Sequence, residues 1–407
     1  MFSVKTPDEV FQIIESSFET CLQTQMLPLH EACGRVLAQD VISAEHIPGF
    51  DRSTVDGFAV HGADTFGCSV SIPALLTLSG EVTMGRCAPA PLATGCCMAV
   101  PTGGAIPEGA DAVVMVEYTE DFGDGTIGVT KPAAPGENLI FRGNDIQPGK
   151  KLLSDGMLLS PREIGVLAAM GYGEVLVRRT PTVGILSTGD ELVPVSQTPA
   201  AGQVRDVNSA MLQALASQLR AHVISYGIFR DDEATLKKAV ENALGECDFV
   251  LISGGSSVGA KDATCRIIES CGELLLHGVA MKPGKPTILG KSGTKAILGL
   301  PGHPAAAFFV ANLFLPVLLD RFQGHSRRRF SVPAVLSESV SANHGRAQYV
   351  GVMLEERQGV LTAVPVHGQS GLIAPLAGTN GYFCIDRDCE GISAGDTVQV
   401  TLYAANL

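Results

Sequence analysis

The sequence has few charged residues, and positively charged ones are especially scarce. Charged residues make up 17% of 407, and 29 Lys and Arg stand against 42 Asp and Glu, a formal net charge of -13. This balance argues against a nucleic-acid-binding protein, because such proteins neutralise phosphates with Lys and Arg. It leaves room for a small anionic substrate in a local basic pocket. Hydrophobic residues make up 45%, which excludes a disordered chain and predicts large cores, and a length of 407 residues predicts two to four domains.

The sequence also lacks CxxC pairs, an export signal and a long uninterrupted apolar run. The 11 cysteines are odd in number and irregularly spaced, and Cys96 and Cys97 are adjacent. Residues 1–14 show no basic segment followed by an apolar one. We therefore expect reduced thiols in a cytoplasmic protein. The uncharged stretch 296–319 is interrupted at Pro301–Pro304, so we expect a buried helix and no membrane span.

The order of the expected elements predicts a multidomain protein of α/β and β type. The first twenty-odd residues contain a capping box, Thr6-Pro7-Asp8-Glu9, followed by a helical apolar stripe. Between about residues 47 and 148, short β-prone runs separated by Gly and Pro indicate a β-rich domain. Strands and helices then alternate, which predicts a doubly wound parallel sheet. The expected strands are 183–187, 223–228, 249–253 and 296–300, and the helices are 209–218, 234–244 and 305–319. Further strands after residue 329 predict a small C-terminal β-barrel.

Gly-rich turns follow three of the expected parallel strands. They are residues 188–191, residues 254–259, which Asp262 follows in the sequence, and residues 301–304, where a helix is expected to begin. Ligands bind at the carboxyl ends of strands in an open α/β sheet, and Gly-rich turns at helix N-termini present free N–H groups to phosphates or oxyanions. One such turn alone is more often an ordinary tight turn. Three on one sheet favour an anion site.

Charged residues near these turns extend the candidate site. The loop 281–286 carries Lys282 and Lys285, each directly followed by a proline that restricts the loop, whereas a lysine pair elsewhere is more often solvated surface. Four carboxylates are candidates for binding Mg²⁺ through oxygen, although each alone is more often a helix cap or a surface residue: Glu191, Asp231, Asp232 and Asp262.

The β-rich region adds polar loops that, taken alone, are typical turns. They are 50–59 with Asp56, 101–105 with Thr102, and 142–145 with Asp145. The sequence has no Ser–His–Asp elbow and no Cys/His zinc spacing, which excludes a triad hydrolase and a structural zinc site.

The chain resembles the molybdopterin molybdenumtransferases, the family that includes the C-terminal domain of gephyrin. The resemblance covers nearly the whole chain and rests on seven segments in the family's order: FDRSTVDGFAV, PTGGAIPEGADAVV, RGNDI, STGDEL, SGGSSVG with Asp262, MKPGKP and GLPGHP. No single segment is decisive, whereas seven in order are specific.

The resemblance implies an elongated homodimer of chains with four subdomains. The expected bounds are 24–43 plus 150–176 for a connecting subdomain, 44–149 for a β-rich subdomain, 1–23 plus 177–329 for an α/β molybdopterin-binding domain, and 330–407 for a C-terminal β-barrel. The α/β domain would resemble the molybdopterin adenylyltransferase fold. The active site would lie between the α/β domain of one subunit and the β-rich subdomain of the other.

The implied activity is insertion of molybdate into adenylylated molybdopterin, with Mg²⁺-dependent release of AMP, to form molybdenum cofactor. The implied protein partners are molybdopterin adenylyltransferase and apo-molybdoenzymes. Cleavage of the anhydride needs cations on the departing phosphate, a metal ion, and a carboxylate to bind the metal or orient water. The sequence supplies the cations and the carboxylates.

The family's functional positions map onto residues of this chain. Asp262 matches the aspartate implicated in hydrolysing the adenylate, and Lys282 and Lys285 match the lysines that face molybdate and the substrate phosphates. Ser257, with the turn Gly254–Gly255, matches the cradle for phosphate and pterin. The other expected positions in the cleft are Asp56, Thr102, Asp145, Glu191, Asp231, Ser253, Pro301, Gly302 and Pro304. The Mg²⁺ candidates among all of these are Asp262, Glu191 and Asp231.

Several positions of this chain differ from the family's pattern, and three of them are positions that the family associates with holding molybdate: Ala306, Gly351, and Ala374 or Pro375. The family's usual Leu-Pro-Gly-Asn-Pro-x-Ser is LPGHPAA here, so that His303 replaces an amide and Ala306 a serine. Gly351 stands where an arginine is usual, and Ala374 or Pro375 where a serine is expected. The hydrolytic residues are therefore retained, while the oxyanion pocket is altered.

These departures leave two alternatives to a molybdenumtransferase. One is a divergent relative that inserts tungstate, and the other is a non-catalytic molybdopterin-binding or scaffold protein. Adenylate hydrolysis separates the scaffold from the enzymes, and metal selectivity separates the two enzymes. Arg346 and Ser370 are candidates for replacing the missing groups.

Overall fold

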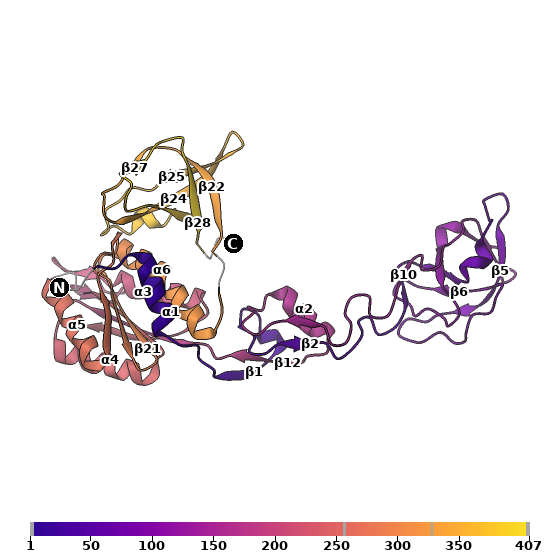
Figure 1. The fold of residues 1–407 in the computed structure, drawn as a ribbon, viewed down its shortest axis with the longest axis horizontal. Coiled ribbons are helices and arrows are strands. Elements are labelled where there is room, and N and C mark those ends of the chain that lie inside the picture. Colours follow the sequence, from indigo (N-terminus) through magenta and orange to yellow (C-terminus); the bar gives the residue numbers. More distant parts are fainter. Residues whose placement is uncertain (1–3, 255–257, 327–328, 404–407) are drawn as a thin grey trace.

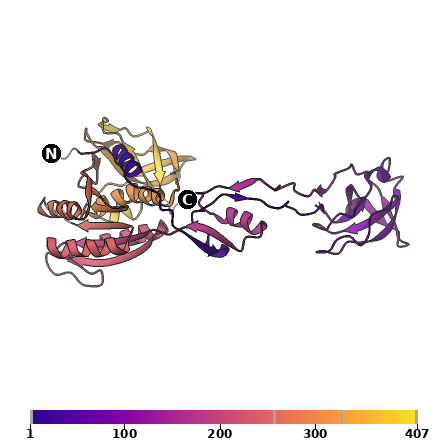
Figure 2. The same cartoon turned by 60° about the horizontal axis from the view of Figure 1, so that its bottom comes forward.

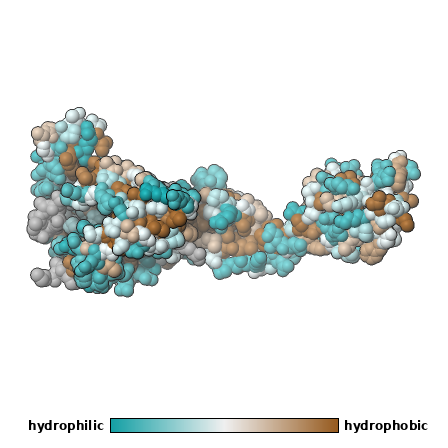
Figure 3. Space-filling view, turned by 90° about the horizontal axis from the view of Figure 1, so that it is seen from above, coloured by the Kyte–Doolittle hydropathy of each residue, from teal (hydrophilic) through white to brown (hydrophobic). Residues whose placement is uncertain are grey.

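The chain is elongated, with its two largest parts at opposite ends (Figures 1 and 2). The structure is a computed structural model that describes residues 4–254, 258–326 and 329–403, with the backbone alone for residues 258–262. An α/β domain and a β-barrel lie together at one end, a β-rich subdomain lies at the other, and a small connecting subdomain lies between them. Figure 3 shows the same outline in space-filling form, with a narrow waist beside the β-rich end.

The α/β domain is built on a six-stranded sheet of order β16-β13-β17-β21-β20-β18. The neighbouring parallel strands are β16 (His222–Phe229), β13 (Thr182–Thr188), β17 (Phe249–Gly254) and β21 (Lys295–Leu300), which confirms the predicted doubly wound sheet. The connection before β21 contains elements that the sequence pattern did not reveal. They are α5 (Val258–Cys271) and the antiparallel edge strands β18 (Glu273–His277) and β20 (Ile288–Ser292).

Helices cover both faces of this sheet. Phe249 and Leu251 of β17 pack on one face, and Val250 and Ile252 on the other, because alternate residues of a strand point to opposite sides. The first face is covered by α1 (Pro7–Ser17), α3 (Val207–Gln218) and α6 (Pro304–Gln323). The second face is covered by α4 (Glu233–Glu246) and α5. The continuous apolar run of β17 follows from this burial on both sides.

Two local predictions for helices agree with the structure. The capping box forms at α1, where the Glu9 N–H donates to Thr6 Oγ1 at 3.2 Å and the Thr6 N–H donates to Glu9 Oε2 at 2.7 Å. Within the described chain, α6 is long and apolar enough to span a bilayer by length and composition, but 67% of its most apolar 18-residue window is buried. It therefore packs as a core helix, as expected from the sequence.

The connecting and β-rich subdomains consist mainly of short strands. The connecting subdomain has two antiparallel ladders and one helix: β1 (Thr24–Pro28) with β12 (Glu174–Arg178), β2 (Val41–Ile42) with β11 (Lys151–Leu153), and α2 (Pro161–Ala169). The β-rich subdomain has a six-stranded sheet of order β7-β4-β6-β5-β9-β8. Its strands are β4 (Gly57–Val60), β5 (Ala74–Glu81), β6 (Cys96–Val100), β7 (Ala112–Met115), β8 (Thr119–Asp121) and β9 (Thr126–Val129), and a separate ladder pairs β3 (Arg52–Ser53) with β10 (Leu139–Ile140).

A closed β-barrel forms the C-terminal part, as predicted. Its sheet has the order β19-β24-β25-β22-β28-β26, and β24 also pairs with β26. The barrel strands are β22 (Ser331–Leu336), β24 (Ala347–Arg357), β25 (Val360–Pro365), β26 (Gly381–Ile385) and β28 (Thr397–Leu402), with a side ladder of β23 (Val340–Ser341) and β27 (Gly391–Ile392). The short strand β19 (Met281–Lys282) comes from the α/β domain and pairs in parallel with β24. This pairing fixes the barrel against the loop that carries Lys282 and Lys285.

Candidate functional site

The carboxyl ends of β13, β17 and β21 lie side by side at one edge of the α/β sheet. Thr188 is in register with Gly254, and Ser253 with Leu300. The turns predicted after these three strands are therefore neighbours, in the place where open α/β sheets bind ligands.

Asn208 joins two of these turns and was absent from the sequence-based predictions. Its side chain is buried, with the residue 7% exposed, and its Nδ2 donates to Ser253 Oγ and to the Gly302 carbonyl, each at 2.8 Å. Asn208 therefore sets the spacing between the ends of β17 and β21. Asn208 lies four residues before the buried Leu212, and residues four apart lie on the same face of a helix. A polar residue on the buried face of a helix needs hydrogen-bond partners there, and this is the sequence signal that could have identified Asn208.

A second group of buried polar side chains supports the same edge of the α/β sheet. Asp206 caps α3 by accepting from the Ser209 N–H at 3.1 Å, and Ser209 Oγ donates to Asp206 Oδ2 at 2.5 Å. Ser209 Oγ also lies 2.7 Å from Ser187 Oγ of β13. A hydrogen-bonded network of buried side chains is rigid, so it holds the start of α3 against the sheet.

Gly254 allows β13 and β17 to approach closely at this edge. Its φ is +140°, and a Cβ there would lie 2.0 Å from the Thr188 carbonyl oxygen. We therefore expect Gly254→Ala to lower the free energy of unfolding by about 2–4 kcal/mol through backbone strain and overpacking. Gly245→Ala on α4, where nothing lies within 4 Å of the added methyl group, is the matched control. It should raise the free energy of unfolding by about 0.5–1 kcal/mol. Denaturant titration measures both, and a Gly254→Ala protein as stable as wild type would contradict the close approach.

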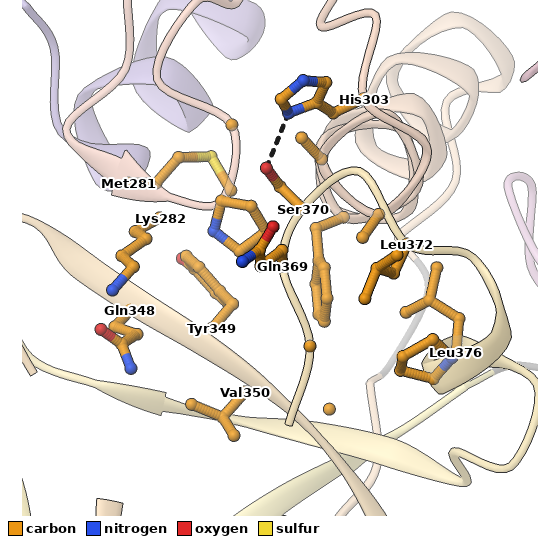
Figure 4. Close-up of a pocket in the computed structure, with 18 of the residues that line it drawn as sticks. Met281, Lys282, His303, Gln348, Tyr349, Val350, Gln369, Ser370, Leu372 and Leu376 are labelled. Atoms are coloured by element: carbon orange, nitrogen blue, oxygen red, sulfur yellow. Dashed lines mark hydrogen bonds between the residues drawn. The ribbon is translucent and has the colours of Figure 1, made fainter. Parts of the chain in front are cut away.

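A pocket of about 980 Å³ opens between the α/β domain and the barrel (Figure 4). The α/β domain contributes residues 281–286 and 301–303, and the barrel contributes β24 and part of the segment 366–379. Because the turn after β21 forms one wall, the pocket lies at the sheet edge described above. The predicted residues Lys282, Lys285, Pro301 and Gly302 all line it, and Pro304 begins α6 beside it.

The pocket is cationic, although the chain has a net charge of -13. Lys282, Lys285 and Arg346 line it, and no Asp or Glu of the described chain does. None of the ion pairs between described residues includes these three cations. Burial raises the pKa of the Tyr349 phenol, because desolvation disfavours the phenolate, so this lining residue adds no negative charge. Unpaired cations beside a helix N-terminus are suited to an anionic ligand.

A histidine and a serine join the two walls of the pocket. His303 Nδ1 lies 2.7 Å from Ser370 Oγ (Figure 4), and the Ala305 N–H donates to the Ser370 carbonyl at 3.1 Å. Three positions where the sequence departs from the pattern of the family that it resembles also line this pocket: Ala306, Gly351 and, of the alternatives Ala374 and Pro375, Pro375. The departures are thus gathered in one place.

The described carboxylates predicted to hold Mg²⁺ lie at the same sheet edge but do not line the cationic pocket. Asp231 follows β16, and its Oδ1 accepts a hydrogen bond from Thr188 Oγ1 at 2.8 Å. Glu191 precedes the short strand β14 (Leu192–Val193), which pairs with β15 (Val204–Arg205). The Glu191 carboxylate covers Gly189, where an added Cβ would lie 2.8 Å from Oε2. Asp232 accepts from the Thr235 N–H and caps α4 instead.

The remaining predictions for phosphate and metal binding fall on Gly255, Ser257 and the side chain of Asp262, which lie outside the described residues. Among the described residues, no group of three or more His, Cys, Asp or Glu could hold a metal ion. Glu191 and Asp231 therefore fit Mg²⁺ only in its common mode, in which one or two carboxylates act together with substrate phosphates and water.

Asp56, Thr102 and Asp145 all belong to the β-rich subdomain, far from these groups, and the structure pairs the first two with each other. The Thr102 N–H donates to Asp56 Oδ1 at 2.7 Å, and the Asp145 N–H donates to the Ile47 carbonyl at 3.1 Å. Figure 1 shows this subdomain, with β6 and β10, at the opposite end of the molecule from β21, and Figure 2 shows the same separation. One chain therefore does not assemble all of the predicted site residues.

Three sequence families match successive parts of the chain. They are described as "MoeA N-terminal region (domain I and II)" over residues 5–171, "Probable molybdopterin binding domain" over residues 184–320, and "MoeA C-terminal region (domain IV)" over residues 333–403. The matches follow one another along the chain in the order that the resemblance predicts.

Whole-chain comparisons agree with these matches. The molybdopterin molybdenumtransferase of Bacillus subtilis is 32% identical over 410 residues, which cover 99% of this chain and 95% of that protein. The protein of the same name from Haemophilus influenzae is 33% identical, with 93% of each chain covered. The crystal structure of the molybdopterin biosynthesis MoeA protein from Pyrococcus horikoshii OT3 superposes with a TM-score of 0.87 at 33% identity, covering 98% of this chain and all of that one. The chain therefore belongs to the MoeA family, the molybdopterin molybdenumtransferases of molybdenum cofactor biosynthesis.

Proposed function

We propose that this protein inserts molybdate into adenylylated molybdopterin, with Mg²⁺-dependent release of AMP, to form molybdenum cofactor. The observation that carries the proposal is the pocket lined by Lys282, Lys285 and Arg346 and by no described carboxylate. An acidic chain that gathers unpaired cations at the carboxyl ends of parallel strands is suited to an anionic substrate. Family membership supports molybdopterin as the substrate class.

Each group at the sheet edge has a part in this reaction. Lys282 and Lys285 would neutralise the oxyanion and the phosphates, and Asp262 would orient the water that attacks the anhydride. Bound Mg²⁺ would supply further positive charge on the phosphate that leaves, with Glu191 and Asp231 as its described carboxylates. The residues that would cradle the phosphates and the pterin are Ser253, Gly254, Gly255, Ser257, Pro301, Gly302 and Pro304.

The site would be completed by a second chain. Asp56, Thr102 and Asp145 belong to the β-rich subdomain, which lies at the far end of the molecule (Figures 1 and 2), so a homodimer would bring the partner's β-rich subdomain over the cationic pocket. Molybdopterin adenylyltransferase would supply the adenylylated substrate, and apo-molybdoenzymes would take the product in the cytoplasm.

The test is AMP release from adenylylated molybdopterin with Mg²⁺, with molybdate and tungstate titrated separately. The cofactor formed is scored by reconstituting an apo-molybdoenzyme. We expect AMP release and active cofactor at low molybdate. Because Ala306, Gly351 and Pro375 line the pocket, a tungstate-inserting relative is the second candidate, and release with tungstate alone would favour it. Binding of substrate without release would identify a non-catalytic protein.

A further inference from the structure

Two segments of the chain, residues 18–24 and 178–182, cross between the α/β domain and the connecting subdomain. They carry the arm, by which we mean the connecting and β-rich subdomains together (Figures 1 and 2). The first crossing is bound to the last turn of α6, where the Cys21 N–H donates to the Phe322 carbonyl at 2.7 Å. The angle between the arm and the α/β domain depends on how these two crossings are held.

Arg178 and Arg179, in the second crossing, bind carboxylates on opposite sides of it. Arg178 Nη2 donates to both carboxylate oxygens of Asp155 at 2.8 Å, and Asp155 belongs to the connecting subdomain. Arg179 Nη2 donates to Asp248 Oδ1 at 2.6 Å, and Asp248 directly precedes β17 of the α/β sheet. Consecutive residues of an extended chain point in opposite directions, so this dipeptide can link two domains.

Arg179 is held at several further points. Its backbone N–H donates to the Gln23 carbonyl at 3.0 Å, which joins the second crossing to the first. Its Nη1 donates to the Thr180 carbonyl at 3.1 Å, and its guanidinium lies 5.2 Å from the centre of the Phe322 ring at the end of α6. One residue therefore contacts both crossings, the sheet and α6.

The ion pair between Arg179 and Asp248 is largely shielded from water. The two side chains are 31% and 16% exposed, and Asp248 Oδ2 also accepts a hydrogen bond from the Thr182 N–H at 2.8 Å. Water screens a fully exposed ion pair and leaves it mobile, whereas directional hydrogen bonds between partly buried charges favour one geometry. The pair is thus suited to fixing an angle.

The connecting subdomain also touches the end of α6 directly, beside the carboxylate that Arg178 binds. His325 Nδ1 donates to the Gly156 carbonyl at 2.9 Å. The backbones approach closely here, because a Cβ on Gly156 would lie 2.6 Å from the Gly324 carbonyl oxygen. This contact closes the joint on its second side, so the arm is attached at more than one point.

We propose that Arg179, through its ion pair with Asp248, is the positioning residue that sets the angle of the arm to the α/β domain. Its consequence for the reaction rests on the proposed function. In the proposed homodimer, this angle decides where the β-rich subdomain of one chain lies over the cationic pocket of the other. Asp248 lies at the amino end of β17, whereas the pocket lies at the carboxyl ends of the strands, so Arg179 acts on the reaction without touching the substrate.

The first measurement is the angle itself, followed by single-molecule energy transfer between two dyes on the full-length protein. The dyes are attached through unnatural amino acids at Lys238, exposed on α4, and at Gln147, exposed in the turn before β11. An excess of unlabelled chains removes transfer between subunits. Arg179→Gln should shift or broaden the distribution of transfer efficiency, because the arm is no longer held at one angle.

Asp248→Asn is a second variant that removes the same ion pair. Its Oδ1 can still accept the Thr182 N–H, so the fold should survive, and the distribution should change as it does in Arg179→Gln. Arg357→Gln is the matched control. Arg357 Nη2 donates to Glu355 Oε2 at 2.8 Å, so this variant also removes an arginine–carboxylate pair, but one that lies within the barrel. It should match the wild type in transfer efficiency and in rate.

The second measurement is AMP release. Arg179→Gln and Asp248→Asn should each lower kcat by about tenfold to a hundredfold, because a misplacement of about 1 Å caused by a distant substitution can cost about a hundredfold. The double variant should be no slower than the slower single variant, because both substitutions remove one and the same interaction.

Three results would overturn the proposal. They are wild-type transfer efficiency in both single variants, an equal change in Arg357→Gln, and additive losses of kcat in the double variant. A pair that only stabilised the α/β domain would give the first of these results. Both variants would then lower the free energy of unfolding, while transfer efficiency and kcat of the folded protein stayed at the wild-type values.

A failure of the proposed function gives a different result. If the wild type releases no AMP while both variants change the transfer efficiency, the proposed function fails, and the role of Arg179 in setting the angle stands. If the wild type releases AMP and both variants transfer energy as the wild type does, only this inference fails.

Discussion

Lys282→Met should slow AMP release and cofactor formation by about a hundredfold, the size of effect seen when one group that stabilises developing charge is removed. Lys282 stands in a pocket lined by no described carboxylate and forms no ion pair with a described residue, so its charge is available to the substrate. We expect the lower end of the usual range, because the Lys282 side chain is exposed in the single chain and water screens it.

The fold should survive this change. Lys282 is held through its backbone, because β19 pairs with β24 and the adjacent Met281 is buried. Lys238→Met, at an exposed position on α4, is the matched control and should leave the rate unchanged. Single-turnover AMP release measures both variants. A Lys282→Met protein as fast as the Lys238→Met control would remove the main support for the cationic pocket as the site of reaction.

The fold was largely predictable where local sequence patterns correspond to burial. The run 249–253 is apolar at every position but the last because β17 packs helices on both faces. The Thr6–Glu9 pattern gave the start of α1 because both of its hydrogen bonds are local. By contrast, β18 and β20 form an antiparallel edge whose short apolar runs resemble a loop, and they are stabilised because β20 pairs with β21 and β18 pairs with β20.

The local turns of the candidate site can be recognised in the sequence, whereas their assembly into one pocket cannot. The turns after β13, β17 and β21 carry Gly-rich signals that can be recognised in a linear sequence. The pocket itself brings Lys282, Arg346 and Ser370 together, which depends on how the barrel docks on α6 and β19. The role of Asn208 was not predicted either, because its two hydrogen-bond partners lie 45 and 94 residues away along the chain.

The second large effect on AMP release concerns Asp56, in the β-rich subdomain at the opposite end of the molecule from Lys282. We expect Asp56→Asn to slow AMP release by about a hundredfold, because in the proposed dimer it removes a carboxylate from the half of the site that the partner would supply. The substitution is conservative in shape, and an asparagine Oδ1 can still accept the Thr102 N–H, so the loop should keep its geometry. If Asp56 and Lys282 act in one site from two chains, the Asp56→Asn and Lys282→Met defects should complement each other.

The most direct test that Asp56 and Lys282 of two chains act in one site is therefore AMP release by mixed dimers. The Asp56→Asn and Lys282→Met chains are coexpressed with different tags, and the dimers are assayed before and after purification through both tags. One site in each mixed dimer would combine a native Lys282 with a native Asp56 from the other chain. A random mixture should then recover about a quarter of the wild-type rate, and purified mixed dimers about half, because one of their two sites is intact. Mixed dimers no faster than either parent would show that these residues do not share a site across the dimer.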